Sequence, residues 1–121
     1  MGDELSVTVS CERGVNIAAI AGAIDISTVA ALRERLFGLA DGGQPLIVDL
    51  NQVTFIDSTG LGVLIGTARR ASVHGVSVHA VCSRPQTREL LRLTGVDRRI
   101  PLSATVDGAL TLLTPSRDDH G

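Results

Sequence analysis

The sequence predicts one α/β domain: a mixed β-sheet, built from an initial hairpin and then αβ repeats, with helices packed on it. Hydrophobic residues make up 44% of the 121 residues, and Phe37 and Phe55 are the only aromatic residues. Such an aliphatic, β-branched core is typical of strands covered by helices. Apolar residues also alternate between strand and helix periods along the chain. We expect the domain to span residues 1–114 and residues 115–121 to be a disordered tail.

Two segments near the N-terminus predict the hairpin. In residues 6–11, valines alternate with small polar residues, which indicates a half-buried strand at an edge of the sheet. Residues 12–14 form a turn. Residues 15–21 are mostly apolar and predict the second strand.

A helix follows the hairpin. Residues 22–28 are expected to form a connection, and Ser27 or Thr28 can cap the helix. Its apolar stripe consists of Val29, Leu32, Leu36 and Leu39. Two glycines end the helix, and Pro45 prevents its resumption.

The middle of the chain predicts a strand, a loop, a helix and another strand. Residues 46–50 (LIVDL) are nearly all apolar, which favours a central parallel strand buried on both faces. Residues 51–59 are expected to be a loop, and a helix covers about residues 60–73. Residues 76–81 alternate as a strand whose His79 faces solvent, as does His74 in the preceding turn.

The C-terminal third predicts two more helices. Ser83 and Gln86 have the spacing of a capping box before a helix that ends at about Thr94. Residues 99–102 predict a short last strand. Thr105 then caps a helix with an apolar stripe at Val106, Ala109, Leu110 and Leu113.

Charge is distributed unevenly. The net charge is −2, which excludes a global basic field for nucleic acid. All eleven basic residues are arginines, and seven of them lie between Arg69 and Arg99, against Glu89 and Asp97. This local excess of five positive charges indicates either solvated helix faces or a polarised surface that steers a charged partner. Single-stranded nucleic acid would need stacking aromatics, and this stretch has none.

Cysteine usage and hydropathy predict a reduced, cytoplasmic protein without a membrane span. Cys11 and Cys82 are far apart, and the sequence shows no secretory signal. A redox disulfide between them is a minor alternative. The longest apolar candidate, residues 61–68, is shorter than the roughly 20 residues that cross a bilayer.

Ser58 stands where a buried strand leads through a short loop into a helix N-terminus. Ligands usually bind at this edge of open α/β sheets. By position alone Ser58 is either a helix cap or a phosphorylation site. A phosphate on it would face free backbone amides and the positive end of the helix dipole. It would also lie beside Asp57, where it would repel a docked partner.

Glycines are unusually frequent at the start of this helix. Each interior glycine costs about 1 kcal/mol relative to alanine, so Gly60, Gly62 and Gly66 require a reason. One interpretation is tight packing of the helix on the sheet. The other is an apolar docking spot beside Ser58, formed by a partly exposed Leu61, Val63 or Leu64.

Enzyme motifs are not found. The glycine spacing does not match a dinucleotide-binding turn, and no phosphate-binding loop follows a strand. Residues 56–60 (IDSTG) lack the leading glycine of a nucleophile elbow. Histidines, cysteines and carboxylates show no metal-ligand spacing, and His120 falls in the tail. We therefore predict a binding module with no catalytic residue, metal or cofactor.

Residues 55–63 (FIDSTGLGV) resemble the signature of the STAS domain, the fold of bacterial anti-sigma factor antagonists and of sulfate transporter tails. Residues 20–25 (IAGAID) and 46–50 resemble the family's second and central strands. The resemblance covers about residues 5–113. The core DSTGLG is specific in this strand, loop and helix context.

The resemblance implies a partner-switching mechanism. The unphosphorylated antagonist binds an anti-sigma factor that is also a serine kinase, and thereby releases a sigma factor. The kinase phosphorylates the serine that follows the motif aspartate, here Ser58, and a serine phosphatase restores the active form. Thr59 is a second candidate acceptor. The resemblance places the partner surface on Asp25, Ser27, Thr28, Asp57, Thr59, Gly60, Leu61, Gly62 and Val63.

Two alternatives and several identities stay open. The alternative to a switched antagonist is a constitutive STAS subunit of a membrane lipid-transport ABC complex, or another interaction module without a switch. A nucleotide-binding module at the glycine-rich helix start is the third hypothesis. The sequence does not identify the sigma factor, the kinase or the phosphatase. The exposed edge strand allows a monomer or a weak dimer.

Overall fold

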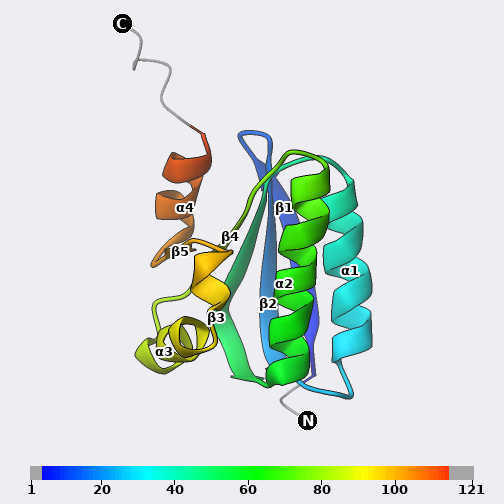
Figure 1. Ribbon diagram of the computed structural model, residues 1–121, viewed down its shortest axis with the longest axis vertical. Helices are drawn as coiled ribbons and strands as arrows, with labels where there is room; N and C mark the ends of the chain where they lie inside the picture. Colours follow the sequence, from blue (N-terminus) through cyan, green and yellow to red (C-terminus); the bar gives the residue numbers. More distant parts are fainter. Residues whose placement is uncertain (1–3, 115–121) are drawn as a thin grey trace, which may run out of the picture.

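The computed structural model describes residues 4–114, which form a five-stranded mixed sheet with helices packed on it (Figure 1). The strands are β1 (Ser6–Glu12), β2 (Val15–Ile24), β3 (Leu46–Ile56), β4 (Val78–Val81) and β5 (Leu102–Ser103). The helices are α1 (Val29–Asp41), α2 (Ser58–Val73), α3 (Pro85–Leu93), the 3-10 turn η1 (Val96–Arg98) and α4 (Val106–Leu113). The strands lie in sequence order. β1 is antiparallel to β2 and the other pairs are parallel, so the predicted fold class is confirmed.

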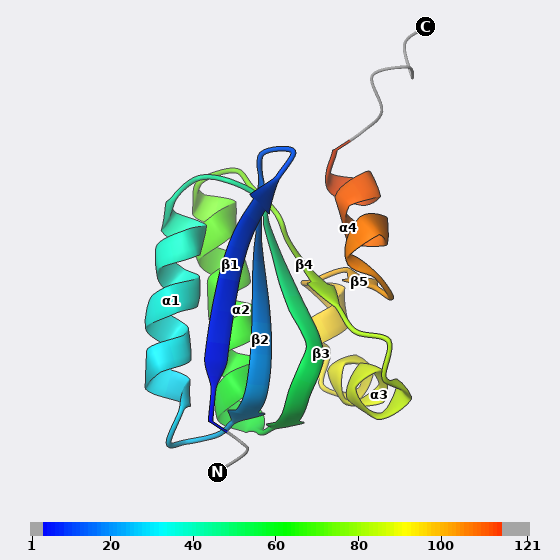
Figure 2. The ribbon, with the colours of Figure 1, turned by 180° about the vertical axis from the view of Figure 1, so that it is seen from behind.

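Helices cover the two faces of the sheet unequally. α1 and α2 pack on one face and form the main core, which is extended by Leu91 of α3, Val96 of η1 and Ile100 just after η1. α4 packs on the other face, where Leu110 joins Ile17 and Ile47 in a smaller cluster. Seen from behind, β1 and most of β2 have no helix over them (Figure 2). The aliphatic core predicted from composition is present in both clusters.

β2 and β3 extend further than the sequence indicates. β2 continues through Gly22 to Ile24, and β3 continues through polar residues to Ile56. The register of the pair shifts between Gly22 and Ala23, and Gly22 has a φ of 102°. Glycine adopts this conformation without strain, so the strand passes the irregularity and continues. The predicted connection from residue 22 and loop from residue 51 were therefore wrong in their first parts.

Other local predictions are confirmed or corrected. β1 lies at the edge, as expected, but it is mostly exposed rather than half-buried. His79 is only 8% exposed, because all of β4 is buried between its neighbours, so the solvent-facing prediction was wrong. Ser83 does not cap α3: its hydroxyl donates to Asn51 Oδ1 across 3.1 Å. The Thr105 cap is confirmed by a 3.0 Å hydrogen bond from the Gly108 amide.

Two further expectations concern the ends of the chain and the membrane. The short strand before α4 is Leu102–Ser103 rather than residues 99–102, because pairing with β4 begins only at Leu102. The predicted tail, residues 115–121, lies outside the described residues. Within residues 4–114, no helix has the length and hydrophobicity to cross a membrane.

Candidate functional site

Asp57 caps helix α2 and joins it to β3. Its backbone is extended, with φ −107° and ψ −172°, and its Oδ1 accepts hydrogen bonds from the amides of Thr59 (3.0 Å) and Gly60 (3.3 Å). The Thr59 hydroxyl donates to the same oxygen across 2.5 Å. This hydroxyl, followed by the two amides, holds the pKa of the Asp57 carboxyl below its ordinary value. Asp57, and not Ser58, therefore satisfies the first turn of the helix.

Ser58 is the first residue of α2, and its side chain is exposed. Among the described residues its hydroxyl has no hydrogen-bond partner. The interpretation of Ser58 as a helix cap was wrong. The expectation that a phosphate there would face free amides also needs correction, because Asp57 already binds the amides of Thr59 and Gly60. What Ser58 offers is an uncommitted hydroxyl next to a carboxylate.

The loop between β2 and α1 holds the second predicted carboxylate. Asp25 Oδ1 accepts from the Ser27 amide (2.9 Å) and from the Ser27 hydroxyl (2.7 Å). These bonds, the hydroxyl first, lower the pKa of Asp25. Thr28 precedes α1 without a side-chain capping bond, and its Oγ1 instead donates to Ala23 O (2.9 Å) and accepts from the Asp25 amide (3.0 Å). Hydrogen bonds from its own polar side chains therefore fix the conformation of this loop.

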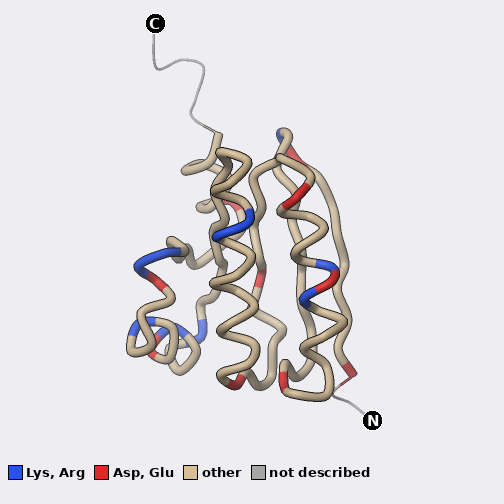
Figure 3. The backbone as a smooth tube through the Cα atoms, turned by 45° about the vertical axis from the view of Figure 1, so that its right-hand side comes forward, with Lys and Arg blue, Asp and Glu red and all other residues tan. Residues whose placement is uncertain are grey.

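The two loops meet at the carboxyl ends of β2 and β3. The Asp57 amide donates to Ile24 O across 3.2 Å, which ties the start of α2 to the end of β2. The carboxylates of Asp25 and Asp57 are close enough to repel each other, a small effect that raises the pKa of Asp57 against the larger lowering by its hydrogen bonds. Figure 3 shows acidic positions near the starts of α1 and α2, at the same end of the molecule. The structure therefore brings Asp25, Ser27 and Thr28 next to Asp57 and Ser58.

Glycines at the start of α2 have different surroundings. A Cβ on Gly60 would lie 2.5 Å from Ile24 Cγ2 and 2.8 Å from Ile56 Cγ1, so the helix packs directly on the strand ends. A Cβ on Gly66 would lie 2.9 Å from Phe37 Cζ of α1. Gly62 has nothing within 4 Å of that position and is exposed. Packing explains the first two glycines and leaves Gly62 without a reason inside the described chain.

The predicted apolar docking spot on α2 is mostly absent. Val63 is 3% exposed, and Leu64 is also buried in the main core, while Leu61 is half-buried. Gly60 is buried as well. Two of the predicted partner-binding residues, Gly60 and Val63, thus lie beneath the surface, where they shape the site from below.

Two exposed apolar residues at this edge were missed. Ile26 follows Asp25 and is 77% exposed, and Phe55 near the end of β3 is 54% exposed. Phe55 pairs in register with Ala23, so it lies at the end of β3 that adjoins the end of β2, and Ile26 follows that end of β2 by two residues. The available signals were an isoleucine in a polar loop and one of only two aromatic residues. They place exposed apolar surface beside the acidic, serine-bearing edge.

Across residues 4–114, no group of three or more histidine, cysteine, aspartate or glutamate side chains could hold a metal ion. The carboxylates of Asp25 and Asp57 are occupied by donors from their own loops. The site presents a hydroxyl, two carboxylates and apolar surface, which together suit recognition by another protein.

Comparison with known proteins places this arrangement in a family. The STAS domain model matches residues 6–109. The anti-sigma-F factor antagonist RsfB of Mycobacterium tuberculosis is 35% identical over 119 residues, which cover 98% of this chain and 97% of that protein. The anti-sigma-B factor antagonist of Bacillus subtilis is 36% identical over 91 residues, covering 75% and 84%. A crystal structure of an anti-sigma factor antagonist from Mycobacterium paratuberculosis superposes with a TM-score of 0.85 at 32% identity, covering 93% of this chain and 97% of that one. The chain belongs to the STAS domain family, as its residues 55–63 predicted.

Proposed function

We propose that this chain is an anti-sigma factor antagonist that is switched off by phosphorylation of Ser58. In this proposal the unmodified chain binds an anti-sigma factor with serine kinase activity and frees a sigma factor, and a serine phosphatase reverses the modification. The full-length similarity to RsfB supports the regulatory role. The observation that carries the switch is the exposed, unpaired hydroxyl of Ser58 at the first position of α2.

The hydroxyl chemistry favours Ser58 over Thr59. Thr59 is half-buried, and its hydroxyl donates to Asp57 Oδ1 across 2.5 Å, so its phosphorylation would remove the shortest of the three hydrogen bonds to the capping carboxylate. Ser58 makes no such contribution to the helix. Modification of Ser58 therefore leaves the capping hydrogen bonds in place.

The phosphoryl transfer needs a base from the kinase. Ser58 Oγ attacks the γ-phosphorus of ATP held by the kinase, the bond from that phosphorus to the bridging oxygen breaks, and ADP leaves. The hydroxyl proton must go to a base. Asp57 is poorly suited to accept it, because three donors occupy Oδ1 and lower its pKa. We assign Asp57 to helix capping and acceptor recognition instead.

Charge explains how the modification would release the partner. A phosphate carries a charge of about −1.5 to −2 at neutral pH. On Ser58 it would lie next to Asp57, with Asp25 on the adjoining loop. A partner that covers Ile26 and Phe55 would have to desolvate this accumulated charge. Binding is favourable for the unmodified chain and unfavourable for the modified one.

Gly62 extends the proposed partner surface along α2. It lies four residues after Ser58, so the two occupy the same face of the helix. An exposed glycine in a helix costs about 1 kcal/mol, and no neighbour within 4 Å requires it. We infer that the anti-sigma factor approaches the backbone of α2 closely at this point.

A phosphorylation assay tests the proposal. The purified chain is incubated with the candidate anti-sigma kinase and ATP, and the modified residue is mapped by mass spectrometry. We expect one phosphate, on Ser58. Ser58→Ala should bind the kinase without being released by ATP. Phosphate on another residue with Ser58 unmodified would contradict the switch, and recovery of an ABC-type ATPase without any kinase would favour the constitutive subunit.

A further inference from the structure

Within residues 4–114, three arginines of the basic stretch from Arg69 to Arg99 have no partner. Of the seven arginines between residues 69 and 99, four are bound to other groups of the chain: Arg70 to Asp41, Arg84 to Val53 O, Arg88 to Cys82 O and Arg92 to Glu89. Within residues 4–114, the guanidiniums of Arg69, Arg98 and Arg99 make no hydrogen bond or ion pair. All three are exposed. The structure has therefore left three charges of one sign uncompensated.

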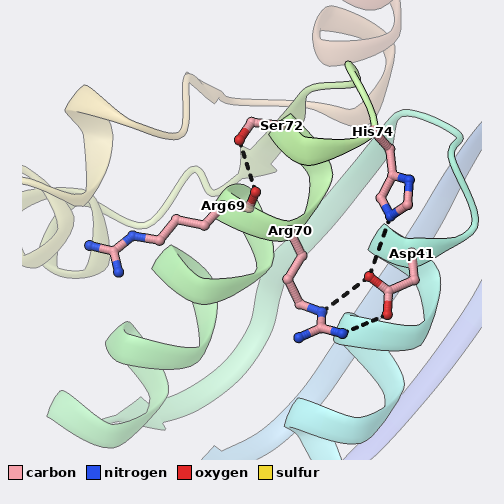
Figure 4. Close-up of polar contacts among 5 residues, drawn as sticks. All are labelled: Asp41, Arg69, Arg70, Ser72 and His74. Atoms are coloured by element: carbon pink, nitrogen blue, oxygen red, sulfur yellow. Dashed lines mark hydrogen bonds and ion pairs between the residues drawn. The ribbon is translucent and has the colours of Figure 1, made fainter.

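These three arginines line a single groove between α2 and the segment from η1 to β5. Its outer part, about 340 Å³, is formed by Ala68, Arg69, Ser72, Arg98 and Arg99. A second hollow of about 260 Å³ shares three of these residues and is completed by Val76, Ser77, Val78, His79 and Pro101. The described residues that line the two hollows include no aspartate or glutamate. Figure 4 shows the Arg69 side chain directed away from the Arg70–Asp41 pair.

His79 adds a second, independent feature. It lines the inner hollow from β4, although it is only 8% exposed. Its ring Nδ1 is buried and has no hydrogen-bond partner in the described structure. A buried polar atom without a partner costs free energy, so such atoms call for a functional or structural explanation. The groove thus combines three free guanidiniums with a lining histidine whose buried Nδ1 is unpaired.

We propose that this groove binds a small anion with two or more phosphoryl groups. The guanidinium fork matches phosphate oxygens in pairs, and three forks from two elements can surround one compact polyanion. The hollow of about 340 Å³ has the size of a small-ligand site, about 300–1,000 Å³, and a polyphosphate places several charges in that volume. Neither aromatic residue lines the groove, so the site recognises the phosphoryl groups and does not stack a base.

The groove is separate from the proposed switch. Ser72 follows Ser58 by fourteen residues on α2, which places it about 21 Å along the helix axis at 1.5 Å per residue. A phosphate on Ser58 of the same molecule cannot reach the groove. The proposal therefore does not depend on the proposed function, and the two can fail separately.

Binding of tripolyphosphate to the whole chain tests the proposal. Titration at 0.15 M salt in a phosphate-free buffer is followed by calorimetry and by amide NMR shifts. We expect saturable binding with shifts at Ala68, Ser72 and His79. Arg99→Gln should weaken binding about tenfold, as loss of a charge-assisted bidentate contact does. Arg69→Gln is a second variant from the other wall of the groove.

Matched controls separate the site from general charge attraction. Arg33→Gln removes the same charge from an exposed arginine of α1 and should leave affinity within about twofold. Ser58→Ala should bind tripolyphosphate like the unaltered chain. No saturable binding, or equal weakening by Arg33→Gln and Arg99→Gln, would overturn the proposal. Hexaglutamate binding as tightly as tripolyphosphate would overturn the phosphate assignment and point to an acidic protein segment.

Discussion

Gly60→Ala offers a direct test of how α2 is seated on the sheet. The added Cβ would lie 2.5 Å from Ile24 Cγ2 and 2.8 Å from Ile56 Cγ1, whereas carbon atoms in good contact are about 3.5–4.0 Å apart. Both atoms are bonded to the branched Cβ of an isoleucine in a strand, so neither can rotate away freely. The methyl group must therefore push the helix from the strand ends.

The size of the effect follows from two opposing terms. Overpacking of this kind costs about 1–3 kcal/mol, and alanine recovers at most about 1 kcal/mol of helix propensity. We expect Gly60→Ala to lower the free energy of unfolding by about 1 kcal/mol. Gly62→Ala gains the propensity without the clash, because nothing lies within 4 Å of its added Cβ. The two variants of the same helix should differ by about 2 kcal/mol.

Urea denaturation followed by circular dichroism at 222 nm measures this difference. The chain has no tryptophan or tyrosine, so intrinsic fluorescence is not useful. The two midpoints should lie on opposite sides of that of the unaltered protein. If Gly60→Ala unfolds at the same urea concentration as Gly62→Ala, the packing of α2 against Ile24 and Ile56 is not as described. Gly62→Ala should also weaken partner binding while it stabilises the fold.

Three other predictions concern charge, capping and pH. Ser58→Glu should weaken binding to the anti-sigma factor by at least about tenfold in calorimetry, because uncompensated charge is costly at an interface. The uncharged Ser58→Gln should weaken binding less. Equal losses for the two variants would exclude charge as the cause. Thr105→Ala should lower the free energy of unfolding by about 1 kcal/mol in urea, because its Oγ1 accepts from the Gly108 amide. Thr111→Ala on the same helix removes an exposed hydrogen bond from the hydroxyl to Asp107 O (3.0 Å), and alanine's helix propensity offsets that loss, so little destabilisation is expected. Similar losses for the two variants would argue against the cap. Burial lowers the pKa of His79 from its ordinary 6.5, so the unfolded chain binds this proton more readily. Stability should therefore fall as pH drops below about 6.5, and His79→Gln should flatten that part of the profile; an unchanged slope would contradict the assignment.

Local periodicity and turn chemistry predicted the fold class and most elements. The hairpin, the central strand and the helix capped by Thr105 each depend on residues close together in sequence. The errors arose where tertiary pairing overrode local signals. β2 passes Gly22 because a shift in register accommodates it, and β4 buries His79 because neighbouring strands and helices enclose it. A single sequence shows neither the register of β2 against β3 nor the elements that pack around β4.

The candidate site was predictable in position and less so in detail. The family resemblance located Ser58 and Asp57, and spacing placed them at a helix start. Which of the two caps the helix depends on a backbone angle at Asp57, which residue type alone does not decide. The exposure of Ile26 and Phe55 depends on how much of the sheet the helices cover. The free arginines could be separated from the paired ones only by their contacts.

The cap formed by Asp57 bears on how a signal written on Ser58 would be transmitted. The three hydrogen bonds to Asp57 Oδ1 do not involve the Ser58 side chain, so we expect them to persist when Ser58 is modified. The phosphorylated and unphosphorylated chains would then differ in surface potential rather than in shape, and their backbones should be nearly superimposable. No refolding step would delay the response. Its speed would be set by phosphoryl transfer and by dissociation of the complex.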